Sequence, residues 1–174
     1  MQLAITALGN NHPRFLAEIL PAIRACKCNL IEIRSTRLSR SVAAYLLIQG
    51  NWNQIAKIES MLDSMQKRLE IKIHAIRPDP NGKMKESMPY SLETISMDRE
   101  NIVESIITFL FDKGIDIEEV SGSSYQTPYV QTSVFSTKFI LLIPPDIHLL
   151  SLREEFLEFC DHLNIDAILE PIKR

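Results

Sequence analysis

The sequence of 174 residues predicts an α+β protein made of two consecutive βαββαβ units, each an antiparallel sheet with its helices on one face. Two observations lead to this prediction. Residues 3–33 align without a gap on residues 90–120, which indicates an internal repeat. Strand-type alternation and helix-type spacing also follow one another in the same order in both copies. That order is typical of the ferredoxin-like sandwich.

Aligned residues of the two copies agree in polarity more often than in identity. At a separation of 87 residues, Ile19 falls on Ile106 and Glu32 falls on Glu119. The later parts of the copies align at a separation of about 94 or 95, so the second copy holds roughly seven extra residues. We expect these residues in "SGSSYQTPYVQTS", whose composition predicts a long connection between strands.

The two copies are separated by the segment "RPDPNGKMKESMP". It is polar and contains three prolines and one glycine, which is a linker composition. The sequence therefore predicts a first domain at residues 1–80, a linker at 81–88 and a second domain at 89–174.

The first copy begins with a strand and a helix. "QLAITALG" alternates loosely between apolar and polar residues, as a half-buried strand does. "RFLAEILPAIRAC" then carries apolar residues at helical spacing. Pro21 lies inside this helix and is expected to bend it or to cost it one hydrogen bond.

Two strands, a helix and a last strand complete the copy. "NLIEIRSTRL" and "SVAAYLLIQG" predict a hairpin joined by "SRS". "NQIAKIESMLDSMQKRL" places Ile55, Ile58, Leu62, Met65 and Leu69 on one helical face. "EIKIHAI" alternates strictly and closes the unit as a strand.

Composition and charge limit the class of protein. Apolar residues make up 45% and charged residues 24%, as in a globular protein. No apolar run reaches the roughly 18 residues of a spanning helix, and the N-terminus lacks a basic signal segment, so we expect a cytoplasmic protein. With 19 basic and 22 acidic residues, the chain lacks the excess of positive charge that is typical of proteins that bind DNA directly.

The residue types that carry catalysis and metal binding show no functional spacing. Cys26, Cys28 and Cys160 do not form a zinc or redox motif, which predicts buried free thiols. The four histidines lack metal-ligand spacing, and neither a nucleophile motif nor a glycine-rich phosphate loop is present. The sequence therefore predicts no metal, no cofactor and no enzymatic activity.

The turn from the first strand to the first helix occurs in both copies, as "GNNHPRF" and "SMDRENI". Free N–H groups and the helix dipole favour an anion such as a carboxylate at a helix start. Asn11 and Asp98 are candidate N-caps, or Asn101 forms a capping box with Glu104. Ordinary capping without a ligand is the alternative.

These turns, together with the entries "CNL" and "GIDI" to the second strand, resemble the ACT domain, a regulatory module that binds amino acids. "ACKCNLIEIR", "GNWNQIAKIE", "FDKGIDIEEV" and "LREEFLEFCDHLNIDAILEPIKR" are similar to the glycine cleavage system transcriptional repressor family, over essentially the whole chain. The resemblance implies a regulator without its own DNA-binding domain. Such a regulator represses by contacting a LysR-type activator, and glycine relieves the repression.

The resemblance also implies effector sites where the first-helix turn meets the second strand of an adjacent ACT unit. Carried over by position, the effector-binding residues are Asn11, His12, Arg14, Phe15, Asn29, Leu30, Asp98, Asn101, Ile102, Asp116 and Ile117. Backbone amides at Phe15 or Ile102 would hold the carboxylate of the effector. Side-chain oxygens of the Asn and Asp residues would accept from its ammonium group.

Both turns depart from the family pattern. Arg14 and Asn101 stand where the family has glycine, and Glu100 stands where it has proline. Asparagine keeps part of the tolerance of glycine for positive φ, whereas arginine mostly lacks it. Arg14 is expected either to clamp a carboxylate in a bidentate fork or to fill the pocket.

Other features leave alternatives open. Trp52 at a helix start predicts a hydrophobic staple or a partner anchor. Tyr125 and Tyr129 predict a partner site on the long connection, or a solvated loop. The rival functions are a regulatory subunit of an amino-acid metabolic enzyme and a small enzyme on the same fold. Exposed sheet edges predict a homodimer.

Overall fold

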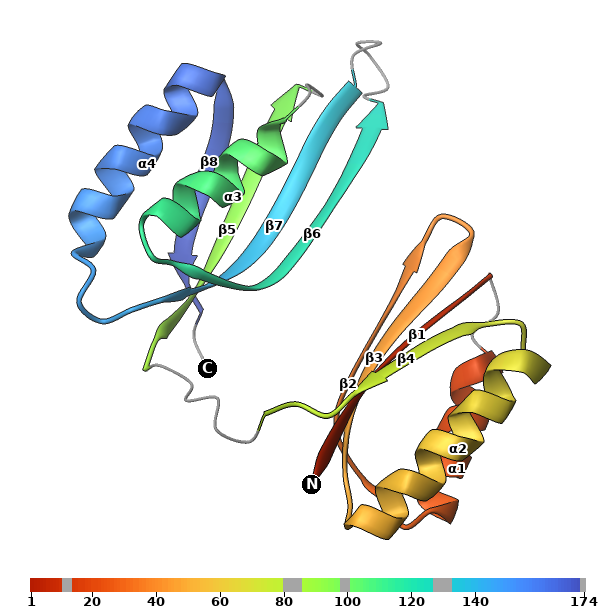
Figure 1. Cartoon of the computed structure of the whole chain (residues 1–174). Helices are drawn as coiled ribbons and strands as arrows, with labels where there is room; N and C mark the ends of the chain where they lie inside the picture. Colours follow the sequence, from red (N-terminus) through yellow and green to blue (C-terminus); the bar gives the residue numbers. More distant parts are fainter. Residues whose placement is uncertain (11–13, 80–85, 98–100, 127–132, 173–174) are drawn as a thin grey trace. The chain divides into compact units, whose positions relative to one another are not determined.

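A computed structural model describes residues 1–10, 14–79, 86–97, 101–126 and 133–172 of the chain. The chain divides into two compact units, which we call unit 1 (residues 1–83) and unit 2 (residues 84–174). Each unit is a four-stranded antiparallel sheet with two helices on one face (Figure 1). The predicted pair of βαββαβ sandwiches is thus confirmed. Most of the predicted linker, residues 81–88, lies outside the described residues.

Unit 1 has the predicted order of elements. They are β1 (Gln2–Asn10), α1 (Arg14–Ala25), β2 (Asn29–Leu38), β3 (Ser41–Gln49), α2 (Trp52–Arg68) and β4 (Lys72–Ile76). The sheet order is β2-β3-β1-β4, and every neighbouring pair is antiparallel. Strand β2 therefore lies at one edge and β4 at the other.

Unit 2 repeats this arrangement. Its elements are β5 (Met88–Met97), α3 (Ile102–Asp112), β6 (Asp116–Gln126), β7 (Ser133–Ile143), α4 (Leu149–Leu163) and β8 (Ile165–Pro171). The sheet order is β6-β7-β5-β8. None of the described helices is both long and apolar enough to cross a bilayer.

The sheet registers refine the correspondence between the units. Leu46 lies opposite Ile5 in unit 1, and Phe139 lies opposite Leu92 in unit 2. The first strands therefore correspond at a separation of 87 residues and the third strands at 93, not at the predicted 94 or 95. Helices α2 and α4 and the last strands correspond at 94, with Lys72 opposite Leu8 and Asp166 opposite Ile95.

The core of unit 1 lies between the sheet and its helices. Alternate residues of β1, such as Leu3 and Ile5, are almost fully buried, as the strand period requires. The predicted stripe of α2 is confirmed for its buried members, Ile55, Ile58, Leu62 and Met65. Pro21 does not end α1, which continues to Ala25.

Helix α2 has a complete N-terminal cap. The side chain of Asn51 accepts a hydrogen bond from the Gln54 amide at 2.9 Å, and the Gln54 side chain accepts from the Asn51 amide at 2.7 Å. Trp52, the first residue of the helix, is 62% exposed. The expectation of a hydrophobic staple at Trp52 is therefore wrong, because so exposed a side chain packs little against the helix.

The core of unit 2 is more aromatic and more polar. The rings of Phe109, Phe156 and Phe159 lie with centroids 4.7 to 6.0 Å apart between α3 and α4. Thr94 and Thr137 are buried and share a hydrogen bond. A buried hydroxyl needs a partner, and each of these threonines supplies one for the other.

The segment predicted as a long connection is partly strand. Residues 121–126 continue β6 and pair with β7 up to the pair Gln126 and Ser133. Glycine and serine weaken strand propensity, but the paired backbone decides the structure here. The expected loop is thus wrong for 121–126, while residues 127–132, including Tyr129, lie outside the described residues.

A β-bulge occurs at the same place in both units. The pairing of β2 with β3 shifts between Leu30 and Glu32, which leaves Ile31 as the extra residue. The pairing of β6 with β7 shifts between Ile117 and Glu119. The two bulges lie 87 residues apart, which supports the repeat independently of residue identity.

Candidate functional site

The turn before α3 has a backbone suited to glycine. Asn101 precedes the helix with φ 69° and ψ 7°, in the left-handed region, and its side chain makes no capping hydrogen bond. The expected capping box of Asn101 with Glu104 is therefore wrong. Asparagine is among the few residues that adopt this conformation readily, which explains how a residue other than glycine is accommodated here.

The first core residue of each helix follows this turn. Phe15 is 2% exposed and Ile102 is 7% exposed, and both belong to the cores of their units. Their side chains anchor the helices to the sheets and leave only backbone groups for a ligand. Arg14 is exposed at the first position of α1. Its side chain is thus directed to solvent and does not fill a buried pocket.

The other predicted site residues stand at the starts of β2 and β6. Asn29 and Asp116 are the first residues of these strands and are exposed. Leu30 is 41% exposed, whereas Ile117 packs partly on the core of unit 2. All four lie on edge strands, where polar backbone groups remain open to a partner.

Within one unit, the helix turn and the strand entry do not meet. Asn29 pairs with Gln49, which also pairs with Gln2 at the start of β1. The helix turn follows Asn10 at the opposite end of β1. No single unit therefore brings its two groups of predicted residues together. The remaining predicted residues, Asn11, His12 and Asp98, lie outside the described residues.

The structure also contains a pocket that the sequence did not predict. A cavity of about 170 Å³ lies between α4 and β8 and is lined by Arg153, Phe156, Leu157, Ala167 and Leu169. The Arg153 guanidinium donates a hydrogen bond to the Leu169 carbonyl at 3.1 Å. None of the predicted effector residues that the structure describes lines this cavity.

The predicted free cysteines are confirmed. Cys26, Cys28 and Cys160 are free and buried. Burial, reinforced by the nearby Asp161 carboxylate, raises the pKa of the Cys160 thiol to about 11, and burial also raises the pKa of Cys28. Such thiols are weak nucleophiles at neutral pH. The described part of the chain contains no group of His, Cys, Asp or Glu residues suited to a metal ion.

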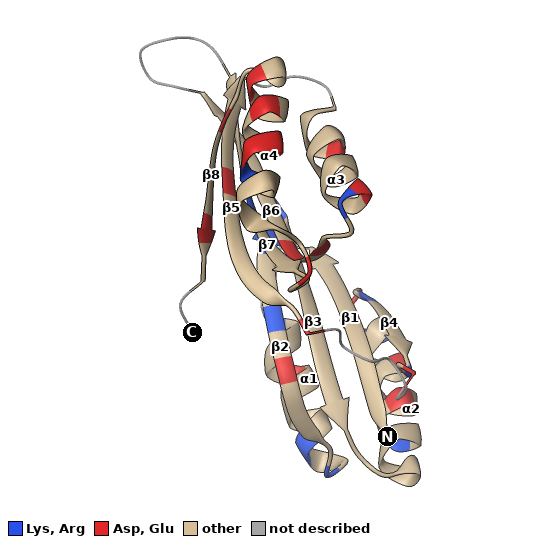
Figure 2. Cartoon of the chain, turned by 90° about the vertical axis from the view of Figure 1, so that its left-hand side faces the viewer, with Lys and Arg blue, Asp and Glu red and all other residues tan. Residues whose placement is uncertain are grey.

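Charge is distributed very unevenly between the units, which the whole-chain total had concealed. Unit 1 holds 12 basic and 6 acidic residues, a net charge of +6, whereas unit 2 holds 7 basic and 16 acidic residues, a net charge of −9. Acidic residues recur along α4 (Figure 2). Counting charge separately for each predicted domain would have found this signal.

Comparison with known proteins agrees with the fold. Residues 1–75 match the ACT domain family. The chain is 24% identical to the glycine cleavage system transcriptional repressor of Escherichia coli (strain K12), over 98% of this chain and 90% of that protein.

Two solved structures share the fold over nearly the whole chain. One, provisionally assigned as a glycine cleavage system transcriptional repressor, is 22% identical with a TM-score of 0.78, over 99% of this chain and 98% of its own. The other, a protein of unknown function from Galdieria sulphuraria, is 18% identical with a TM-score of 0.76, over the same shares.

Proposed function

We propose that the chain, whose residues 1–75 match the ACT domain family and whose unit 2 repeats the same fold, is an amino-acid-responsive transcriptional regulator. The observation that carries the proposal is the extent of the similarity to the E. coli repressor, which spans 98% of this chain and so includes both units. A match confined to one ACT domain would suit many regulated proteins. The end-to-end match favours a protein in which two such units are the functional assembly.

The proposed mechanism is repression by protein contact in the cytoplasm. The regulator binds a LysR-type activator of the glycine cleavage genes and keeps it inactive, without a DNA-binding domain of its own. Glycine binds the regulator and relieves the repression. This requires only that glycine bind the free and the activator-bound regulator with different affinity.

The turn before α3 is the better supported of the two effector sites. Asn101 has the left-handed backbone that allows a ligand to approach the helix start closely. The Ile102 amide and the dipole of α3 favour the carboxylate, and the Asn101 side chain, which caps no helix amide, is available to the ammonium group. At the start of α1, the exposed Arg14 offers a guanidinium for the carboxylate instead.

Calorimetric titration with glycine and a panel of other amino acids tests the sensor. We expect a saturable heat with a small amino acid. Asn101→Gly should retain the backbone geometry and lose only the side-chain contact, whereas Asn101→Val should abolish binding at this turn, because a β-branched residue is strained at positive φ. Arg14→Ala reports on the other turn. A folded sample that gives no heat with any amino acid would refute the proposal.

Co-purification tests the partner. The tagged regulator should retain a purified LysR-type activator, and added glycine should reduce the retained amount. Recovery of an amino-acid metabolic enzyme in place of the activator would point to a regulatory subunit. A sequence-specific gel shift by the regulator alone would contradict action through protein contact.

The proposal includes a homodimer. Strands β2 and β6 are edge strands whose residues are exposed throughout, apart from the half-buried Ile117, and such edges favour association. Sedimentation over a range of concentrations measures the oligomeric state. A monomer at every concentration would exclude this part of the proposal.

A further inference from the structure

Opposite charges occupy equivalent positions at one end of the two units. Lys67 in the last turn of α2 corresponds to Asp161 in the last turn of α4. Lys72 at the start of β4 corresponds to Asp166 near the start of β8. All four side chains are exposed. The repeated fold thus presents the same end twice, with the sign of its charge reversed.

Helix stability explains only half of this reversal. The C-terminal end of a helix carries a partial negative charge, which a lysine stabilises and an aspartate opposes. Lys67 is thus accounted for by its own helix, whereas Asp161 acts against the dipole of α4. A different interaction is required to account for Asp161.

Each charged end also carries an exposed apolar residue. Lys72 pairs with Leu8 across β4 and β1, and Leu8 is 45% exposed. Asp166 pairs with Ile95 across β8 and β5, and Ile95 is 47% exposed. Both pairs lie on the sheet face that the helices leave open. Exposed apolar side chains bordered by charge are typical of protein interfaces.

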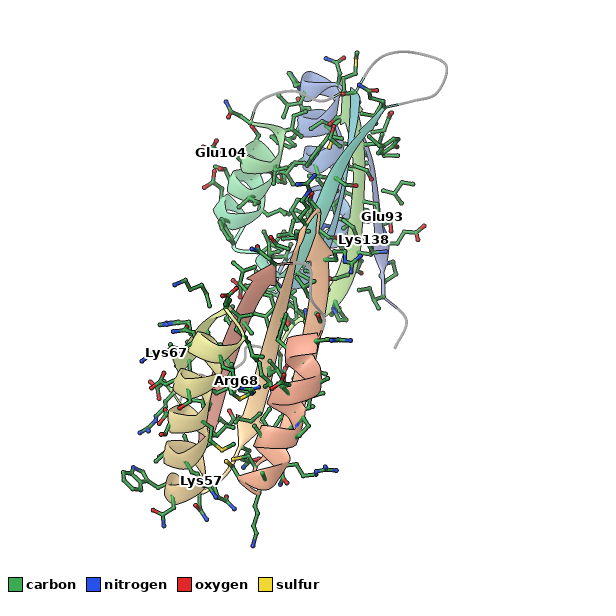
Figure 3. The ribbon with its side chains drawn as sticks, turned by 90° about the vertical axis from the view of Figure 1, so that its right-hand side faces the viewer. Lys57, Lys67, Arg68, Glu93, Glu104 and Lys138 are labelled. Carbon is green, nitrogen blue, oxygen red and sulfur yellow. The ribbon has the colours of Figure 1, made fainter. Side chains whose placement is uncertain are left out.

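The open face of unit 2 is hollowed at this place. A cavity of about 500 Å³ is lined by Glu93, Ile95, Ser136, Thr137, Lys138, Asp166, Ala167 and Ile168. Glu93 and Lys138 form an ion pair at 2.6 Å in its wall (Figure 3). Among the described residues no cation pairs with Asp166, so the hollow keeps a negative charge beside the apolar Ile95 and Ile168.

The matching end of unit 1 is rich in cations. Arg14 begins α1, and Arg37 lies in the β2–β3 hairpin, where it pairs with Val42. These ends adjoin, because Asn10 at the end of β1 pairs with Ser41 at the start of β3. An ion pair between Arg68 and Glu18 fixes α2 to α1. Lys67 and Lys72 remain exposed beside it. The exposed Glu70 lies between them in the chain, but Arg14, Arg37, Lys67 and Lys72 outnumber it, so this end has a net positive charge.

We propose that two copies of the chain associate by placing the basic corner of unit 1 (Leu8, Lys67, Lys72) from one copy on the acidic hollow of unit 2 (Ile95, Asp166) and on the adjoining end of α4 (Asp161) in the other. Leu8 meets the apolar wall, Lys72 faces Asp166, and Lys67 faces Asp161. Each copy carries one corner and one hollow, so two such contacts related by a two-fold axis close a dimer.

Charge complementarity selects a second copy over other occupants. A nucleic acid would use the lysines but would leave the hollow and the reversed aspartates without a role. A second copy uses both surfaces at once. The contact is independent of the effector and of the activator, so its failure leaves those parts of the proposed function untouched. A monomeric wild-type chain would exclude both this contact and the homodimer proposed above.

Charge reversal with mixing tests the contact. In sedimentation at about 50 mM salt, the wild-type chain should dimerise, and about 500 mM salt should weaken the dimer, since exposed ion pairs are screened. Lys67→Glu/Lys72→Glu and Asp161→Lys/Asp166→Lys should each raise the dissociation constant about tenfold or more, because like charges then face one another. An equimolar mixture of the two variants should restore the dimer, since every contact between them is again of opposite sign.

A matched control uses the same helix. Lys57 and Lys67 lie toward opposite ends of α2 (Figure 3), so Lys57→Glu makes the same change of net charge as Lys67→Glu alone, but away from the corner. Lys57→Glu should leave the dissociation constant unchanged, whereas Lys67→Glu should raise it. If a reversed variant folds poorly by circular dichroism, Lys67→Gln/Lys72→Gln gives the same test with a smaller effect.

Four results would overturn the inference. The first is a wild-type chain that stays monomeric under all conditions, and the second is a dimer unaffected by either double reversal, which would assign association to other surfaces such as the strand edges. The third is an equimolar mixture of the two variants that remains monomeric. The fourth is a reversal of the lysines that abolishes retention of duplex DNA and leaves sedimentation unchanged, which would show that the basic corner binds a polyanion.

Discussion

The two units reach the same fold with different interior residues. Unit 1 has Ala7 facing Ala44 across β1 and β3, whereas unit 2 has Thr94 facing Thr137 at the same register. The alanines need no partner, and the threonines satisfy one another by a hydrogen bond. The comparison teaches that a βαββαβ sandwich fixes which positions are buried, while it leaves their chemistry open.

The helix layers differ in the same way. Unit 2 joins α3 to α4 through the ring of Phe109 packed on Phe156 and Phe159. At the corresponding places unit 1 has Leu62 and Met65 on α2. Aromatic pairs contribute beyond their buried area, so we expect the stability of unit 2 to be concentrated in this cluster.

The largest expected effect is the loss of one ring from that cluster. Phe156→Ala should destabilise unit 2 by about 3–5 kcal/mol, because it leaves a cavity among rings that cannot close over it. Phe111→Ala is the control, since Phe111 is on α3 but is 58% exposed. Urea unfolding followed by circular dichroism measures both, and equal losses would refute the role given to the cluster.

The next effect concerns close packing under β1 in unit 1. A Cβ at Gly9 would lie 2.7 Å from Cγ2 of Ile71, which is buried, whereas unit 2 has Ser96 at the corresponding position. Gly9→Ala should therefore cost about 1–3 kcal/mol by overpacking. Fluorescence of Trp52, the single tryptophan, follows the unfolding of unit 1. If Gly9→Ala lowers the free energy of unfolding less in an Ile71→Ala background than in the wild type, the destabilisation arises from this contact. An equal loss in both backgrounds would contradict that explanation.

Cys160 should make the stability of unit 2 dependent on alkaline pH. The folded pKa of about 11 lies above the ordinary value of 9.0, so the contribution is present below pH 9.0 and is lost as pH rises through 11. We expect a loss of about 1 kcal/mol near pH 10. The difference in urea midpoint between the wild type and Cys160→Ala isolates this group from other titrations. A difference that stays constant from pH 8 to pH 11 would contradict the assignment.

The smallest effect exchanges one residue between the units. Lys27 and Gly114 occupy equivalent turns, with φ of 57° and 71°. Lys27→Gly should stabilise unit 1 by roughly 0.5–1 kcal/mol, and Gly114→Lys should destabilise unit 2 by a similar amount, because lysine is strained in this region and glycine is not. A Cβ at Gly114 meets no atom within 4 Å, so the effect is one of backbone strain alone. Thermal unfolding measures the change in stability of each variant. Changes of the same sign in the two variants would refute the explanation.

The fold could be predicted because its information is local and repeated. Periodicity located the helices, and the correspondence of Ile19 with Ile106 joined the two copies. The strand at 121–126 could not be predicted from its serine and glycine, since its pairing partner lies further along the chain. Local composition describes a preference, and backbone pairing overrides it.

The candidate site was predicted less well, because caps depend on single dihedral angles. A sequence pattern suggested a capping box at Asn101, yet the same residue adopts positive φ and leaves its side chain uncapped. Pattern alone cannot distinguish these two uses of asparagine, since both occur at helix starts. The unequal distribution of charge could be read from the sequence, but it becomes visible only when charged residues are counted separately for each unit.

The paired bulges shorten the regular part of two edge strands, β2 and β6. Ile31 in unit 1 and its counterpart Glu118 in unit 2 interrupt the strands at the outer edges of the sheets. A bulge bends an edge strand and breaks the regular spacing of its hydrogen-bonding groups. An incoming strand from an unfolded neighbour would find the regular spacing of β2 confined to Glu32–Leu38 and that of β6 confined to Glu119–Gln126. The irregularity thus shortens the template that these two edge strands offer for the addition of further chains.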